Sequence, residues 1–144
     1  MSATFVPDTS VVVKWLRQGE VLAAQALALR AAYLDGKIEL LAPDLLAYEL
    51  ANVLRYKVEL STASVELAVQ SVFDMGLEWA APTASLMRRA AAIARAAEVT
   101  VFDAAFAALA ESAGATFVTA DKALVRRLAG WPCVLFLGNV EAER

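Results

Sequence analysis

Short apolar stretches alternate with longer helical patterns along most of this 144-residue chain. The apolar stretches have the length of strands, and turn residues separate them from segments with helical periodicity. Strands that alternate with helices favour a parallel sheet covered by helices on both faces. The expected strands are residues 4–7, 38–42, 77–80, 116–119 and 133–137, and the expected helices are 11–16, 20–34, 43–60, 61–75, 82–97, 101–113 and 122–128.

The composition predicts a single folded domain over residues 1–144. Hydrophobic residues make up 60% of the chain and charged residues 20%, which excludes a disordered chain. The longest charge-free stretch, 128–140, contains Gly and Pro residues and is too short to span a membrane. The N-terminus has no basic segment ahead of an apolar core, so we expect no signal peptide. The single cysteine, Cys133, allows no internal disulfide, and we expect a cytoplasmic protein.

Two residue counts restrict the chemistry that this chain can perform. It has no histidine, which excludes an imidazole base, proton relay or metal ligand. Its one cysteine excludes a zinc site built from thiolates of the same chain. Carboxylates that bind a hard cation such as Mg²⁺ or Mn²⁺ are then the leading option for catalysis.

Four acidic residues are candidate ligands for such a cation. Asp8 directly follows the expected strand 4–7, and Asp121 lies two residues after the expected strand 116–119. The carboxyl ends of parallel strands are where α/β proteins bind ligands. Asp103 lies in the first turn of an expected helix. Glu49 lies in the middle of a largely apolar helix, where a carboxylate is seldom buried unless it is paired or bound to metal.

Each of these acids also has a purely structural interpretation. Asp8 and Asp121 are suited to cap the helices that follow them. Thr100 and Asp103 have the spacing of a capping box, and Glu49 is compatible with an ordinary charge at the edge of its helix.

If the four carboxylates converge, they repel one another by roughly 4 kcal/mol per pair at about 4 Å and an effective dielectric constant of about 20. Such a group needs a cation, or some of its members stay protonated. An oxygen-lined site for Mg²⁺ or Mn²⁺ is the natural solution in a chain without histidine. Metal sites of this kind cut phosphodiesters by activating water, and they need no nucleophile from the protein.

These acids lie in four segments that together resemble the motifs of PIN-domain ribonucleases, in the right order and over nearly the whole chain. The length is typical of single-domain VapC-type toxins. The four segments are FVPDTS at 5–10, PDLLAYELANVL at 43–54, VFDAAFAALA at 101–110 and FVTADK at 117–122.

The resemblance implies a three-layer α/β/α sandwich around a parallel sheet of about five strands. It implies that Asp8, Glu49, Asp103 and Asp121 hold one or two Mg²⁺ or Mn²⁺ ions, supported by Ser10, Thr119 and Asn52. The implied activity is that of an endoribonuclease toxin that cleaves RNA and inhibits translation. The implied partners are a VapB-type antitoxin, which inserts a helix and an arginine-bearing tail near the acidic pocket, a second copy in a homodimer, and operator DNA bound by the toxin–antitoxin complex.

The net charge of −3, from 13 basic and 16 acidic residues, is unusual for a protein that binds nucleic acid. Local placement matters more than the total, and two Mg²⁺ ions would cancel four negative charges. Basic residues on the helices after Asp8 and Asp121 are candidate contacts for RNA phosphates, with a solvated helix face as the alternative. They are Lys14, Arg17, Lys122, Arg126 and Arg127. The apolar composition also predicts exposed apolar surface, and the helices over 20–34 and 43–75 are candidates for an antitoxin groove.

Two other functions remain open at this stage. One is a non-catalytic PIN-like module that binds RNA or protein, which four intact acids disfavour. The other is a phosphatase with an aspartyl-phosphate intermediate. That chemistry usually places a second aspartate two residues after the first, and this chain has Ser10 there.

Overall fold

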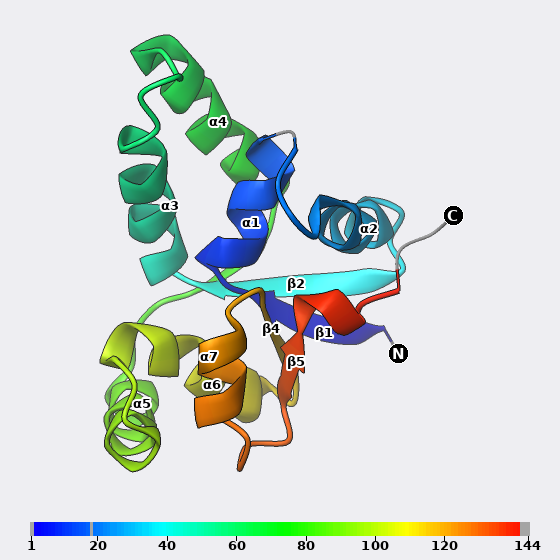
Figure 1. Cartoon of the computed structure of the whole chain (residues 1–144). Helices are drawn as coiled ribbons and strands as arrows, with labels where there is room; N and C mark the ends of the chain where they lie inside the picture. Colours follow the sequence, from blue (N-terminus) through cyan, green and yellow to red (C-terminus); the bar gives the residue numbers. More distant parts are fainter. Residues whose placement is uncertain (1, 18, 142–144) are drawn as a thin grey trace.

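The computed structural model describes residues 2–17 and 19–141. Along the described chain, helices and strands alternate as the sequence predicts (Figure 1). The elements are β1 (Ala3–Pro7), α1 (Thr9–Leu16), α2 (Ala23–Leu34), β2 (Ile38–Pro43), α3 (Leu45–Arg55), α4 (Thr62–Asp74), β3 (Glu78–Ala80), α5 (Ala84–Ala97), α6 (Val101–Ala113), β4 (Thr116–Thr119), α7 (Lys122–Arg127), β5 (Val134–Phe136) and a short 3₁₀ helix (Leu137–Asn139).

The strands form one five-stranded parallel sheet in the order β3-β2-β1-β4-β5. In the centre, Phe5 of β1 aligns with Leu40 of β2 on one side and with Thr116 of β4 on the other. The chain runs from β1 to β2 and β3 on one side of the sheet. It then crosses to the other side of β1, where it forms β4 and β5. The order therefore reverses between β1 and β4, and a crevice opens at such a point outside the carboxyl ends of the strands.

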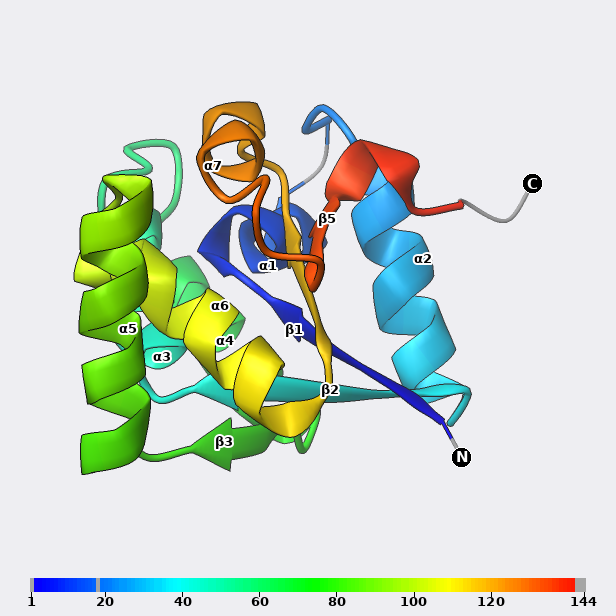
Figure 2. The ribbon, with the colours of Figure 1, turned by 90° about the horizontal axis from the view of Figure 1, so that it is seen from below.

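Helices cover both faces of the sheet, which confirms the predicted three-layer α/β/α sandwich. Helices α1, α2, α3 and α4 lie on one side, and α5, α6 and α7 lie on the other (Figure 1). Seen from below, α6 runs across the face of the sheet, and α5 lies beside α6 at the margin of the molecule (Figure 2). No helix among the described residues is long and apolar enough to cross a membrane.

Small side chains let α6 lie close to the sheet. Its buried stretch, residues 104–110, has alanine at five of its seven positions, and alanine combines high helix propensity with little bulk. Phe106 in this stretch stacks on Phe117 of β4, with ring centroids 5.9 Å apart. This packing fixes α6, and with it Asp103 in the first turn of α6, relative to the end of β4.

Two helix starts predicted from proline are wrong. Pro43 does not open a helix but ends β2, opposite Ala80 of β3. Helix α3 begins only at Leu45 and ends at Arg55 instead of continuing to about residue 60. Pro82 likewise lies two residues before α5, whose first turn is capped by the side chain of Thr83, which accepts from Leu86 N. Proline tolerates a first helical turn but is equally suited to extended backbone, and for Pro43 the pairing of β2 with β3 decides between the two.

The other element boundaries lie within three residues of those expected. The predicted restart at residue 61 is also confirmed, because Ser61 is the N-cap of α4 and its side chain accepts from Ser64 N.

Candidate active site

Asp8 lies at the carboxyl end of β1, in the crevice where the strand order reverses. Its backbone N–H donates to Val118 O of β4 at 3.1 Å, which extends the ladder between the two strands. The side chain is only 7% exposed. Its Oδ1 accepts from Ser10 Oγ at 2.5 Å and from Val11 N at 3.3 Å. The predicted capping role is therefore correct. It anchors the Asp8 carboxylate at the carboxyl end of the central strand β1.

Hydroxyl groups connect the end of β1 to the end of β4. Ser10 Oγ accepts from Ala120 N at 2.9 Å and lies 3.5 Å from Thr119 Oγ1. Thr119 Oγ1 in turn accepts from Asp121 N at 3.1 Å. Ser10 and Thr119 therefore hold the two aspartate-bearing segments side by side.

Asp121 is the N-cap of α7, where its Oδ1 accepts from Leu124 N at 3.1 Å. Asp103 lies in the first turn of α6, and its backbone N–H donates to Thr100 Oγ1 at 3.1 Å. Asp121 therefore caps its helix as predicted, whereas at the start of α6 the capping side chain is that of Thr100. These caps do not exclude a second role for the two carboxylates, because the charge of Asp121 acts on Asp103.

Glu49 lies half-buried on α3, and its Oε1 accepts from Thr9 Oγ1 at 2.8 Å. Thr9 was not among the site residues predicted from the sequence. The available signal was a hydroxyl residue directly after Asp8, in the first turn of a helix. Asn52, which was expected to brace Glu49, is exposed on α3, and in the described residues the side-chain bond to the Glu49 carboxylate comes from Thr9.

The pKa values couple the candidate acids in pairs: Asp8 with Asp103, Glu49 with Asp103, and Asp103 with Asp121. Burial raises the pKa of Asp8 to about 6, against the lowering effect of its bonds to Ser10, Thr119 and Val11. Burial also raises the pKa of Glu49 and of Asp103. The charge of Asp103 adds to the increase for both Asp8 and Glu49, and the charge of Asp121 adds to the increase for Asp103. Asp103 is therefore the acid that connects the other three.

The donors in this group are of the type that a hard divalent cation requires. All are carboxylate or hydroxyl oxygens, and among the described residues no cationic side chain lowers the pKa of Asp8, Glu49 or Asp103. A buried, uncompensated aspartate such as Asp8 is costly to ionise, and a cation would relieve that cost. No three acidic or cysteine side chains of the described chain already stand together as a complete set of metal ligands. The residues fit Mg²⁺ or Mn²⁺ by the chemistry of their oxygen donors, and a bound ion would have to draw the carboxylates together.

The model of the PIN domain matches this chain over residues 5–130. The chain belongs to the PIN domain family. PIN domains are in general nucleases. None of the curated proteins matches the chain significantly.

Solved structures of low sequence identity share the fold of this PIN domain. The protein PAE2754 from Pyrobaculum aerophilum is 18% identical, with a TM-score of 0.68 over 96% of this chain and 92% of that one. A toxin–antitoxin complex from Klebsiella pneumoniae contains a chain that is 17% identical, with a TM-score of 0.67 over 94% and 98%. DNA-bound VapBC from Salmonella typhimurium contains one that is 19% identical, with a TM-score of 0.64 over 94% and 98%.

The basic residues of this PIN domain are distributed unevenly around the acids. Lys14 Nζ lies 3.9 Å from Glu20. Arg17 pairs with Glu20 at 3.0 Å and also with Glu59. Both therefore lie toward the carboxyl end of α1, away from Asp8, and acids of the protein already neutralise them.

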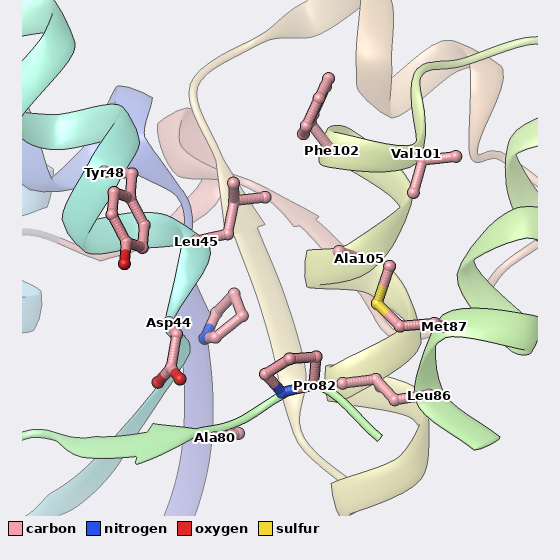
Figure 3. Close-up of a pocket in the computed structure, with 11 residues that line it drawn as sticks. Asp44, Leu45, Tyr48, Ala80, Pro82, Leu86, Met87, Val101, Phe102 and Ala105 are labelled. Carbon is pink, nitrogen blue, oxygen red and sulfur yellow. The ribbon is translucent and has the colours of Figure 1, made fainter. Parts of the chain in front are cut away.

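An apolar pocket of about 370 Å³ opens beside the acids, between α3, α5 and α6 (Figure 3). Tyr48 of α3 and Phe102 of α6 both line it, and they are 77% and 59% exposed, respectively. Each of these aromatic residues directly precedes one of the acids, Glu49 and Asp103. The candidate site thus borders on exposed apolar surface of the kind that marks interfaces.

Proposed function

We propose that this PIN domain is a Mg²⁺- or Mn²⁺-dependent endoribonuclease and the toxin of a VapBC-like toxin–antitoxin pair. The observation that carries the proposal is the pairwise electrostatic coupling that links Asp103 to Asp8, to Glu49 and to Asp121. Asp103 raises the pKa of two of these acids, and Asp121 raises that of Asp103. Structural caps alone give no reason for four acids from four elements to lie within reach of one another.

In this proposal the four acids hold one or two divalent cations, which activate water and stabilise the charge that develops on the phosphate oxygens. Other residues of the protein orient these carboxylates. Ser10 fixes one oxygen of Asp8, and Thr9 fixes one oxygen of Glu49. Thr119 orients the backbone that carries Asp121. Bonds of this kind orient ligands and tune their affinity for a metal.

The surface of the protein supports an antitoxin as partner. Large apolar side chains are exposed around α2 and on the α3–α4 hairpin, the two regions that the sequence nominated for an antitoxin groove. They are Val21, Leu27, Leu34, Tyr48, Tyr56, Val58, Leu67 and Phe73. An amphipathic helix of an antitoxin would bury such side chains. The structural relatives include toxin–antitoxin complexes, some of them bound to DNA, and we extend both partners to this chain. We also expect a homodimer, for which exposed Met87, Val101 and Phe102 at the apolar pocket offer a surface.

Incubation of the purified, antitoxin-free protein with total RNA tests the enzymatic proposal. We expect discrete fragments with Mg²⁺ and none with EDTA. Asp8→Asn and Asp103→Asn should fold and fail to cut, whereas Asp35→Asn, which changes an exposed acid at the end of α2, should cut normally. Cleavage that persists in EDTA would contradict the role of the metal. RNA binding that is equal in wild type and variants, without cleavage in either, would favour the non-catalytic binding module.

The toxin role needs a separate experiment in cells. Induced expression of the wild-type chain should arrest growth and lower incorporation of labelled amino acids. Asp8→Asn, expressed to the same level, should do neither. If RNA is cut in vitro but growth and translation stay normal in the cells tested, the nuclease proposal stands and the toxin proposal fails.

A further inference from the structure

A second, polar pocket of about 250 Å³ lies between the first turns of α6 and α7. Asp103 and Asp121, two of the proposed metal ligands, form part of its lining. Thr100 contributes a hydroxyl, and Glu98 and Arg127 line it as well. Arg127 is therefore the basic residue among those that line this acidic pocket.

Helix α7 directs its basic residues to two different places. Arg127 lines the polar pocket together with Asp121, Ala123 and Leu124 of the same helix. Lys122 and Arg126 instead line a separate hollow of about 290 Å³ with Phe136 and Asn139. Lys122 Nζ also lies 5.5 Å from the centroid of the Phe136 ring. The helix therefore separates two neighbouring arginines that the sequence alone presented as equivalent.

Arg127 is held by Glu98 and not by the acids of the site. Its Nη1 donates to the backbone oxygen of Glu98 at 3.2 Å and lies 3.8 Å from Glu98 Oε2. Glu98 ends α5 in the left-handed region, with φ of 57°. The Arg127 and Glu98 side chains are 53% and 84% exposed, and exposed ion pairs of this kind contribute little to stability. Arg127 thus lines the same pocket as Asp103 and Asp121, while its guanidinium is held at Glu98 by a contact that is easily exchanged.

We propose that Arg127 binds a phosphate of the RNA backbone beside the scissile bond. Glu98 holds the guanidinium of Arg127 in place until an RNA phosphate replaces Glu98 as its partner. This inference rests on the proposed endoribonuclease function. An arginine suits the role because its planar fork donates two parallel hydrogen bonds to a phosphate. Glu98 then competes with RNA for the same guanidinium, which makes it a modulator of affinity and not a ligand.

The test is RNA binding measured by fluorescence anisotropy with a labelled single-stranded RNA of mixed sequence, in Mg²⁺ and over a series of salt concentrations. Asp8→Asn serves as the background, so that cleavage does not disturb the measurement. We expect Arg127→Ala to weaken binding by about threefold to tenfold and to reduce the salt slope by about 0.7, the value for one phosphate contact on a single strand. Arg127→Lys should keep most of the slope but lose affinity. Arg95→Ala, at an exposed arginine of α5, is the matched control and should bind normally.

Glu98 is tested through Arg127. Glu98→Gln should raise RNA affinity by about twofold, because it removes the charge that competes with phosphate. The same change in an Arg127→Ala background should have no effect. An equal gain in both backgrounds would mean that Glu98 simply repels RNA, and it would overturn its proposed part.

The results separate this inference from the proposal on which it rests. If the wild-type protein neither binds nor cuts RNA in Mg²⁺, the proposed function fails. If the wild type cuts RNA but Arg127→Ala keeps the full salt slope, or Arg126→Ala loses as much of it, the function stands and the inference is wrong. A lower melting temperature of Arg127→Ala with an unchanged slope would show that Arg127 only secures the end of α5.

Discussion

Thr9 Oγ1 donates a hydrogen bond to Glu49 Oε1 at 2.8 Å and so joins the first turn of α1 to the middle of α3. The two residues are 40 positions apart, and each follows a different strand of the sheet, β1 and β2. The bond satisfies one oxygen of a half-buried carboxylate that no cation of the described chain stabilises. It also sets the direction of that carboxylate relative to Asp8, the neighbour of Thr9 in the chain.

Replacement of Thr9 by valine removes this bond at nearly constant shape. We expect the affinity for Mg²⁺ and the rate of RNA cleavage to fall by about tenfold or more, as is typical when a group that orients a metal ligand is lost. Stability should change by only about 1 kcal/mol. Thr9→Ser keeps the hydroxyl and should stay close to the wild type. A Thr9→Val variant with normal Mg²⁺ affinity, measured by calorimetry, would contradict this role.

Asp8 should reduce the stability of the metal-free protein above about pH 6. Its pKa in the folded protein is about 6, above the ordinary value of 3.8, so the unfolded chain binds fewer protons between these values. The free energy of unfolding therefore falls as the pH rises through that window. This increase in the pKa of Asp8 lowers the free energy of unfolding at high pH by about 3 kcal/mol.

Asp8→Asn removes that destabilisation but keeps an oxygen to accept from Ser10 and Val11. Urea unfolding without metal should show the variant to be more stable at pH 8, and the advantage should disappear near pH 4. Added Mg²⁺ should stabilise the wild type and not the variant, because only the wild type gains a ligand. A variant that is less stable than the wild type at pH 8 would mean that the buried carboxylate is already compensated.

Asp103 should connect the titrations of the other acids. Its negative charge raises the pKa of both Asp8 and Glu49, so Asp103→Asn should lower both values. The measurement is a pH titration of the carboxyl carbons by NMR in the absence of metal. Glu66→Gln, at an acid on the outer helix α4, is the control and should leave both pKa values unchanged. Unchanged values in Asp103→Asn would place Asp103 outside the group.

The two phenylalanines of α6 should differ sharply in their effect on stability. Phe106 is 1% exposed and stacks on Phe117, whereas Phe102 is 59% exposed. Phe106→Ala should cost about 3–5 kcal/mol, the range for truncation of a buried aromatic side chain. Phe102→Ala should cost less than about 1 kcal/mol. Equal losses in urea unfolding would mean that Phe102 is buried in solution, by a second copy for example.

Local sequence was sufficient for the fold class and for the candidate acids. The alternation of strand and helix patterns predicted the parallel sheet, because each pattern reflects which faces of an element are buried. Asp8 and Asp121 were identifiable because they end strands, and parallel strands bring their carboxyl ends to one edge. Thr100 and Asp103 marked the start of α6 correctly, since a cap depends only on residues within one turn.

Only the tertiary structure decided what depends on contacts between distant segments. Pro43 belongs to β2 and not to a helix because it lies opposite Ala80 of β3, a pairing that its own neighbours do not reveal. Thr9 supports Glu49 because β1 and β2 are adjacent strands. Arg127 lines the same pocket as Asp121 while Arg126 lines a different one, because the packing of α7 on β4 and β5 sets its rotation. Sequence fixes local conformation through short-range sterics and capping, whereas strand order and helix rotation follow from burying the whole core at once.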